Sequence, residues 1–114
     1  MDKIKVSSCI ITYNHEGFLR ECLESAINQK VNFDYEIVIG QDCSTDGTHQ
    51  ICLEYANKYP DLIKYYPREN NLGMIGNWLS TIGQCKGKYI ALCEGDDYWT
   101  DPLKLQKQVD FLEK

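Results

Sequence analysis

The run Tyr89-Ile90-Ala91-Leu92-Cys93 and the stretch that follows it, Glu94-Gly95-Asp96-Asp97-Tyr98-Trp99, decide how the whole chain is interpreted. Five consecutive apolar residues predict a buried β-strand. Three carboxylates then fall within four positions, and carboxylates this crowded are usually paired or neutralised by a metal ion. The carboxyl ends of strands are also where open α/β sheets bind their ligands. The sequence therefore predicts a cation site directly after a strand.

Apolar runs alternate with helical patterns along the rest of the chain, which is typical of a parallel α/β fold. Apolar runs predict strands at 5–11, 35–39 and 63–66, in addition to the one at 89–93. Apolar residues at helical spacing predict helices over 18–27, 51–59 and 78–85, and Pro102 is expected at the first position of a final helix. We expect one domain over residues 1–114, with a mostly parallel sheet of about four strands flanked by helices.

Composition and charge narrow the classes of function. The 114 residues carry a net charge of -5, which argues against non-specific nucleic-acid binding because that needs a basic face. No apolar stretch approaches the roughly 20 residues that span a bilayer, and no signal-peptide pattern begins the chain, so we expect a cytoplasmic protein. The six cysteines contain no CxxC pair, which favours free thiols over disulfides or a zinc site.

Polar loops follow the first two predicted strands. Thr12, Tyr13 and Asn14 offer a hydroxyl, an aromatic face and an amide, which together suit a nucleobase; the alternative for Asn14 is a cap on the first helix. Asp42 ends the second strand and is expected to accept hydrogen bonds from a base or a ribose. Ser44 and Asp46 suffice as caps for the next helix, which leaves Asp42 available for a ligand.

The remaining polar candidates have weaker signals. Arg68 and the glycines at 73 and 76 are interpreted as an ordinary surface turn rather than as a phosphate site. His15 and His49 lack carboxylate or cysteine partners at metal-ligand spacing, so both are expected to be structural. Asp96 and Asp97 are hard oxygen ligands suited to Mg²⁺ or Mn²⁺ beside substrate phosphates. The alternative for this pair is a solvated acidic turn before the last helix.

Four motifs, in order along the chain, resemble those of the family 2 glycosyltransferases with the GT-A fold. Residues 7–14, Ser-Ser-Cys-Ile-Ile-Thr-Tyr-Asn, resemble the opening strand and its T-Y-N, and Cys22-Leu23-Glu24-Ser25 with Gln29 resembles the C-L-x-S…Q helix. Residues 36–48, Glu-Ile-Val-Ile-Gly-Gln-Asp-Cys-Ser-Thr-Asp-Gly-Thr, resemble the D-D-x-S-x-D-G-T signature. Residues 87–97 resemble the G-x-Y-I strand and the DXD region.

The resemblance implies a Rossmann-like nucleotide-binding half and a role for each loop. Thr12, Tyr13, Asn14 and Asp42 would contact the nucleotide of a sugar donor, most simply a UDP-sugar. Asp96 would bind ribose or metal, and Asp97 would coordinate the divalent cation. Gln41 replaces the first acid of the usual D-D pair, and Glu94 stands where the first Asp of DXD is common and is expected only to shape the loop.

The resemblance also implies what the chain would do. Family members transfer a sugar with inversion from a nucleotide-diphosphate sugar to an acceptor hydroxyl, here in the synthesis of a cell-surface polysaccharide or glycoconjugate. The acceptor would be a saccharide or a lipid-linked saccharide, and any membrane association would be peripheral and would belong to a full-length protein. The general base is expected beyond residue 114, because family domains continue into an acceptor half. The alternatives are a non-catalytic nucleotide- or metal-binding module, a receiver-like signalling module and a nucleotidyltransferase.

Overall fold

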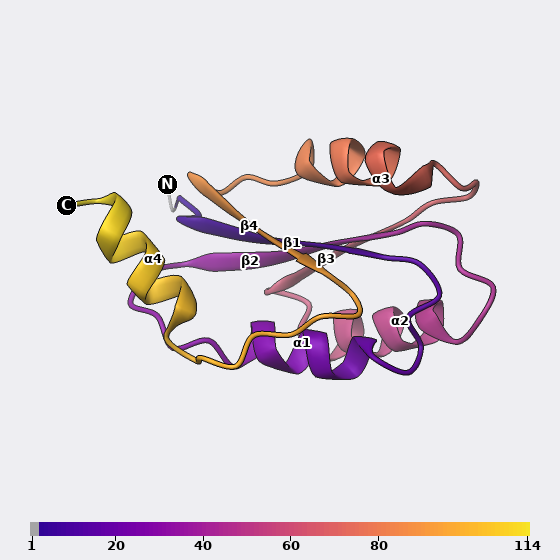
Figure 1. The fold of residues 1–114 in the computed structure, drawn as a ribbon, viewed down its shortest axis with the longest axis horizontal. Coiled ribbons are helices and arrows are strands. Elements are labelled where there is room, and N and C mark those ends of the chain that lie inside the picture. The colour runs from indigo at the N-terminus through magenta and orange to yellow at the C-terminus, as the bar shows by residue number, and fades with distance from the viewer. Residues whose placement is uncertain (1–2) are drawn as a thin grey trace.

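The computed structural model describes residues 3–114, which form four strands and four helices in strict alternation (Figure 1). The strands are β1 (Val6–Thr12), β2 (Tyr35–Gln41), β3 (Ile63–Pro67) and β4 (Tyr89–Glu94). The helices are α1 (Leu19–Ile27), α2 (Thr48–Lys58), α3 (Gly73–Ile82) and α4 (Lys104–Leu112). This element order confirms the predicted α/β alternation.

The strands form one parallel sheet in the order β3-β2-β1-β4. All seven residues of the central strand β1 are buried. Val6 pairs with both Tyr35 and Tyr89, and the register continues in step along both neighbours. Because the strands are parallel, their carboxyl ends meet at one edge of the sheet, where the ladder brings Ile11 beside Glu94.

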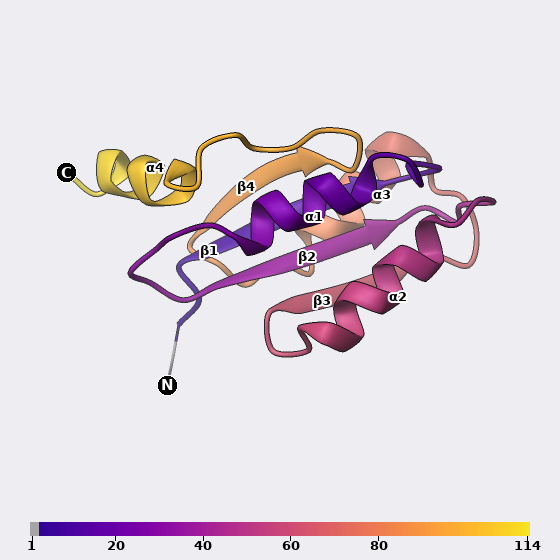
Figure 2. The same ribbon diagram turned by 90° about the horizontal axis from the view of Figure 1, so that it is seen from below.

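Helices cover both faces of the sheet. α3 lies alone on one face, and α1 and α2 lie on the other (Figure 1). Seen from below, α1 crosses in front of β1 and β2, and α2 in front of β3 (Figure 2). The main core fills the space between the sheet and these two helices and includes Ile10, Leu19, Leu23, Ile37 and Ile39. α4 packs at the start of β1, where Leu105 and Val109 contact Val6.

α3 packs on the sheet through polar side chains. Its buried residues are Asn77 and Thr81, whereas Leu79 is 68% exposed, so the apolar face expected for this helix is not the one that packs. The Asn77 amide donates to the Gly40 carbonyl at 2.9 Å. A Cβ at Gly40 would lie 2.7 Å from Asn77 Oδ1 and nearer still to Thr81 Oγ1. Glycine at position 40 therefore permits the close approach of helix and sheet.

β4 is an edge strand, so the prediction that 89–93 is a buried strand is wrong. Cys93 is buried, but Ile90 is 41% and Leu92 is 55% exposed. β4 stands at the end of the strand order, so it pairs with β1 on one side only. The apolar run alone does not distinguish a central strand from an edge strand.

The last helix also begins later than predicted. α4 starts at Lys104, and Pro102 lies in the turn before it, where its carbonyl accepts the Lys30 N–H at 2.7 Å. Asp101 Oδ1 accepts the Leu103 N–H at 2.9 Å and so closes this turn. Within the described residues, no helix is both long enough and apolar enough to cross a bilayer.

Candidate functional site

A cleft of about 400 Å³ opens at the carboxyl edge of the sheet. Its walls come from the end of β1, the start of α3 and the end of β4. It is lined by Ile11, Thr12, Tyr13, His15, Asp42, Asn71, Gly73, Met74, Asn77 and Glu94. A hollow of about 450 Å³ between β4 and α4 lies away from the strand ends and has mainly apolar walls. Of the site residues singled out in the sequence, Thr12, Tyr13 and Asp42 therefore line the cleft, and none lines the apolar hollow.

The end of β1 contributes two different surfaces to the cleft. Thr12 is only 1% exposed, and its Oγ1 lies 3.0 Å from Nδ1 of His15. Tyr13 is 45% exposed, so its ring is free to meet a flat ligand. This pair therefore combines a fixed hydroxyl with an open aromatic face.

Asn14 joins the loop after β1 to the loop after β2. Its Oδ1 accepts the Thr45 N–H at 2.8 Å, and its own N–H donates to Ser44 Oγ at 3.0 Å. Its φ of 53° is left-handed, a conformation that Asn tolerates better than most residues. The alternative of a helix cap is wrong, because no side chain caps α1. Asn14 does not line the cleft but fixes the loops beside it.

Asp46 strengthens the same junction. Its carboxylate accepts the N–H of Thr48 at 2.9 Å and the N–H of Glu16 at 3.2 Å. Desolvation raises the pKa of Asp46, but hydrogen bonds from Thr48 and from the Glu16 backbone outweigh it, so the pKa is lowered overall. Of the two caps predicted for α2, Asp46 accepts the N–H of its first residue, Thr48, whereas Ser44 bonds Asn14. Asp46 also holds the turn before α1 through Glu16.

Asp42 faces the cleft and is also bonded by the protein itself, a second task that the sequence did not predict. It is 5% exposed, and its two carboxylate oxygens accept the N–H groups of Leu72 at 2.6 Å and Gly73 at 3.1 Å. The Asn71 amide donates to the Asp42 carbonyl. The Asp42 carboxylate thus holds the N-terminus of α3. The sequence did not reveal this role because Asp42 and Leu72 are far apart along the chain. Asp42 still lines the cleft, and each carboxylate oxygen keeps a second lone pair.

The acidic loop after β4 is anchored to β1 through its backbone. The Gly95 N–H donates to the Ile11 carbonyl at 2.8 Å, and the Asp97 N–H donates to the Glu94 carbonyl at 2.9 Å. Cys22 donates to the same Glu94 carbonyl at 3.6 Å and lies 3.9 Å from Cys93. The contact with Cys93, together with burial, raises the pKa of Cys22 and keeps it a thiol. The loop therefore has a fixed backbone.

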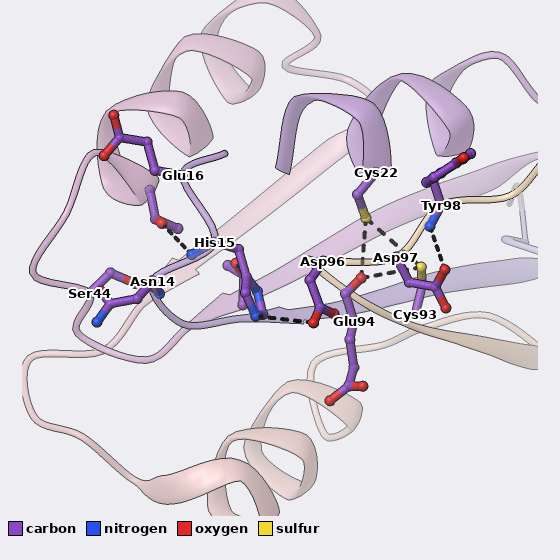
Figure 3. A network of polar contacts seen from close by, with 12 residues as sticks. Asn14, His15, Glu16, Cys22, Ser44, Cys93, Glu94, Asp96, Asp97 and Tyr98 are labelled. Carbon is purple, nitrogen blue, oxygen red and sulfur yellow. Dashed lines mark hydrogen bonds and ion pairs between the residues drawn. The ribbon is translucent and has the colours of Figure 1, made fainter. Parts of the chain in front are cut away.

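The three carboxylates of this loop point in different directions (Figure 3). Asp96 Oδ2 lies 3.8 Å from His15 Nε2, and Asp97 Oδ1 accepts the adjacent Tyr98 N–H at 2.9 Å. Glu94 points away from both and lines the cleft (Figure 3). Among residues 3–114, no three His, Cys, Asp or Glu side chains are grouped to hold a metal ion. The exposed pair Asp96 and Asp97 still fits a magnesium-type ion, which takes one or two carboxylates beside substrate phosphates.

The structure also changes the roles expected for three other residues. His15, predicted to be structural, lines the cleft between Thr12 and Asp96. Glu94, expected only to shape the loop, also faces the cleft. Arg68 does not line the cleft; its guanidinium donates to Asn77 Oδ1 at 3.4 Å and Thr81 Oγ1 at 3.1 Å. The spacing rules missed the position of His15 because its carboxylate neighbour, Asp96, lies in the loop after β4.

Both the amino-acid sequence and the fold of this chain are similar to those of known glycosyltransferases. Residues 7–114 match the model of "Glycosyl transferase family 2". An uncharacterised protein of Mycobacterium tuberculosis is 46% identical over 91% of this chain, and the abequosyltransferase RfbV of Salmonella typhimurium is 39% identical over 81%. The crystal structure of residues 1–349 of Staphylococcus aureus TarS, in complex with UDP, superposes on 96% of this chain with a TM-score of 0.82 and 32% identity.

The matches cover nearly all of this chain but only part of each relative. The chain spans 30% of the mycobacterial protein, 28% of RfbV and 32% of the TarS chain. The four predicted motifs lie within or beside the matched range, and the parallel α/β sheet agrees with the superposed structure. The match argues against a receiver-like module or a nucleotidyltransferase. The chain belongs to glycosyl transferase family 2.

Proposed function

We propose that this chain is the donor-binding part of an inverting, metal-assisted glycosyltransferase that acts in cell-surface polysaccharide or glycoconjugate synthesis. The observation that carries the proposal is one cleft in which Thr12, Tyr13 and Asp42 adjoin the loop bearing Asp96 and Asp97. Nucleotide sugars need both a base site and a diphosphate site. TarS, similar over 96% of this chain, has been crystallised with UDP and with UDP-GlcNAc, which supports a UDP-sugar as donor.

The nucleoside would occupy the β1 and β2 side of the cleft. The exposed ring of Tyr13 would stack on the base, because aromatic side chains favour flat apolar partners. Asp42 would accept hydrogen bonds from the base or ribose through the lone pairs that the α3 amides leave free. Because those amides hold Asp42 rigidly, its position would not depend on the ligand.

The charge of the cleft supports a metal-assisted diphosphate site. None of its described lining residues is Lys or Arg, whereas Asp42 and Glu94 are both acids. A diphosphate brought into this surface would be repelled unless a cation accompanied it. Asp97, together with Asp96, would hold Mn²⁺ or Mg²⁺. The bound ion would neutralise the diphosphate leaving group as a Lewis acid.

The acceptor and the general base belong to the longer protein in this proposal. The chain covers about a third of the TarS chain, and no described residue is assigned as the base. A base in the acceptor half would take the proton of an acceptor hydroxyl as it attacks the anomeric carbon opposite the nucleotide. The acceptor would be a saccharide or a lipid-linked saccharide.

Calorimetry with UDP and Mn²⁺ tests the donor site. We expect UDP to bind the 114-residue chain, and Mn²⁺ to tighten that binding by about tenfold or more. Asp97→Ala should remove most of the effect of Mn²⁺. Asp61→Ala serves as a control, because Asp61 is an exposed acid in the turn before β3, at the opposite edge of the sheet. Absence of UDP binding, or metal-dependent binding that survives Asp97→Ala, would refute the proposal.

A further inference from the structure

We infer that His15 is a positioning residue that couples nucleotide binding on the β1 side of the cleft to metal binding on the acidic loop. This inference rests on the proposed function and adds a residue and a mechanism to it. The coupling means that metal and nucleotide each bind more tightly in the presence of the other, by the same factor. His15 would contribute to that factor by holding the two binding surfaces in a fixed relation.

The imidazole ring of His15 bridges two loops. Its Nδ1 lies 3.0 Å from Thr12 Oγ1, and its Nε2 lies 3.8 Å from Asp96 Oδ2 (Figure 3). The His15 side chain is 23% exposed, against 50% for Asp96, so the histidine is the more confined of the two. One ring nitrogen thus faces Thr12, which lines the cleft, and the other faces Asp96, a proposed metal ligand.

The backbone of His15 is fixed independently of any ligand. Its N–H donates to Thr48 Oγ1 at 2.9 Å, and its carbonyl accepts the N–H groups of Phe18 and Leu19, each at 2.9 Å. Thr48 is fully buried at the first position of α2. The ring therefore extends from a rigid junction of α1 and α2, so a movement of Asp96 would change its contact with the ring instead of shifting the histidine.

Gly95 is a second, independent sign that the acidic loop is fitted to this histidine. A Cβ at Gly95 would lie 2.7 Å from Thr12 Cβ and 2.8 Å from His15 Nδ1. Any side chain at position 95 would push the loop away from the Thr12–His15 pair. The loop that carries Asp96 and Asp97 therefore packs directly on the pair, and this contact depends on residue 95 being glycine.

The tautomer of the ring decides which atom donates in the contact with Thr12. If the Thr12 hydroxyl donates to Nδ1, the ring proton resides on Nε2 and faces the Asp96 carboxylate. We expect nitrogen-15 NMR of the chain without ligands to show a proton on Nε2 of His15. A ring protonated on Nδ1 alone would contradict the bridge, because Nε2 would then have no proton to face Asp96.

Linked titrations of UDP and Mn²⁺ measure the coupling directly. The coupling factor is the ratio of the UDP dissociation constants without and with saturating Mn²⁺. In His15→Asn, the amide can replace Nδ1 toward Thr12 but does not reach Asp96. We expect the coupling factor of this variant to fall about threefold to tenfold relative to that of the wild type. Gly95→Ala should lower the coupling factor in the same direction by displacing the loop.

His49→Asn is the matched control. His49 is the other histidine of the chain, and its Nδ1 bonds Tyr65 Oη at 2.7 Å away from the cleft. We expect His49→Asn to keep the wild-type coupling factor, and thermal unfolding of all variants checks that they fold. Equal loss of UDP affinity with and without metal in His15→Asn, or an unchanged coupling factor, would overturn the inference. Absence of UDP binding by the wild type would instead refute the proposed function and, with it, this inference.

Discussion

The loops after β1 and β2 and the loop after β4 meet at the same edge of the sheet, but they are built differently. The first two are tied to each other by side chains, with Asn14 bonding Ser44 and Thr45, and Asp46 bonding Glu16. In the loop after β4, the backbone is anchored while the carboxylates of Asp96 and Asp97 stay exposed (Figure 3). The difference suggests that the nucleoside side is preformed, whereas the metal side keeps its ligands free until a cation arrives.

The largest expected effect on stability concerns α3, the helix that packs on the sheet at Gly40. Gly40→Ala should lower the free energy of unfolding by about 2 to 3 kcal/mol, because the added methyl group overlaps Asn77 and Thr81 and forces α3 off the sheet. Gly17→Ala is the control, since no atom lies within 4 Å of a Cβ there, and it should change stability by less than about 0.5 kcal/mol. Urea denaturation measures both, and equal effects would contradict the close approach.

Replacing one aspartate by alanine on each side of the site distinguishes the preformed nucleoside side from the metal side. Asp42→Ala should cost about 1 to 2 kcal/mol of stability, because it leaves the Leu72 and Gly73 N–H groups without their acceptor. Asp97→Ala should cost less than about 0.5 kcal/mol, because the exposed carboxylate bonds only its neighbour Tyr98. Chemical denaturation of both variants is the measurement, and a destabilised Asp97→Ala would show that the acidic loop is structural.

A smaller effect is expected from the two left-handed residues of the preformed side. Asn14→Gly should cost about 0.5 to 1 kcal/mol, because glycine keeps the φ of 53° but loses the bond to Thr45. Cys43 has a φ of 56°, and Cys43→Gly relieves the same backbone strain without deleting a loop-to-loop amide contact. Cys43→Gly should have a higher midpoint temperature of thermal unfolding than Asn14→Gly. The reverse order would mean that the hydrogen bond between the Asn14 side chain and Thr45 is dispensable.

The smallest effect is the pH dependence contributed by Asp46. Its pKa is lowered in the folded chain, so its stabilising contribution is present above the unfolded value and is lost as pH falls through the lower, folded pKa. The stability difference between the wild type and Asp46→Asn should therefore be largest near neutral pH and should shrink below about pH 4. Urea titrations at pH 7 and pH 3 measure it, and a constant difference would mean that the charge is unimportant.

The fold was largely predictable because its signals are local. Apolar runs and helical spacing gave all eight elements in order, and the strand-end loops that carry Thr12, Tyr13 and Asp42 were correctly expected to meet at one edge. The exposure of β4 was not predictable, since an apolar run has the same sequence whether its strand is central or at an edge.

The details of the site depend on contacts between distant residues, which a sequence pattern does not contain. The contact between Asp42 and the start of α3 joins positions 30 residues apart. The ring of His15, in the loop after the first strand of the sequence, meets Asp96, in the loop after the last strand. The residue types predicted which chemical groups lie at the carboxyl edge of the sheet. Only the three-dimensional arrangement shows which side chains are already engaged by the protein.

The central position of β1 has a consequence for how the chain reaches its native state. β1 is the first strand in the sequence, but one of its two neighbours, β4, is the last. The sheet is therefore complete only when Val6 has paired with Tyr89. Pairings this distant slow folding, because the intervening loop must close before the contact stabilises anything. During synthesis, the outer side of β1 would stay unpaired until almost all of the described chain has emerged. The acidic loop, which needs Ile11 as its anchor, would form last.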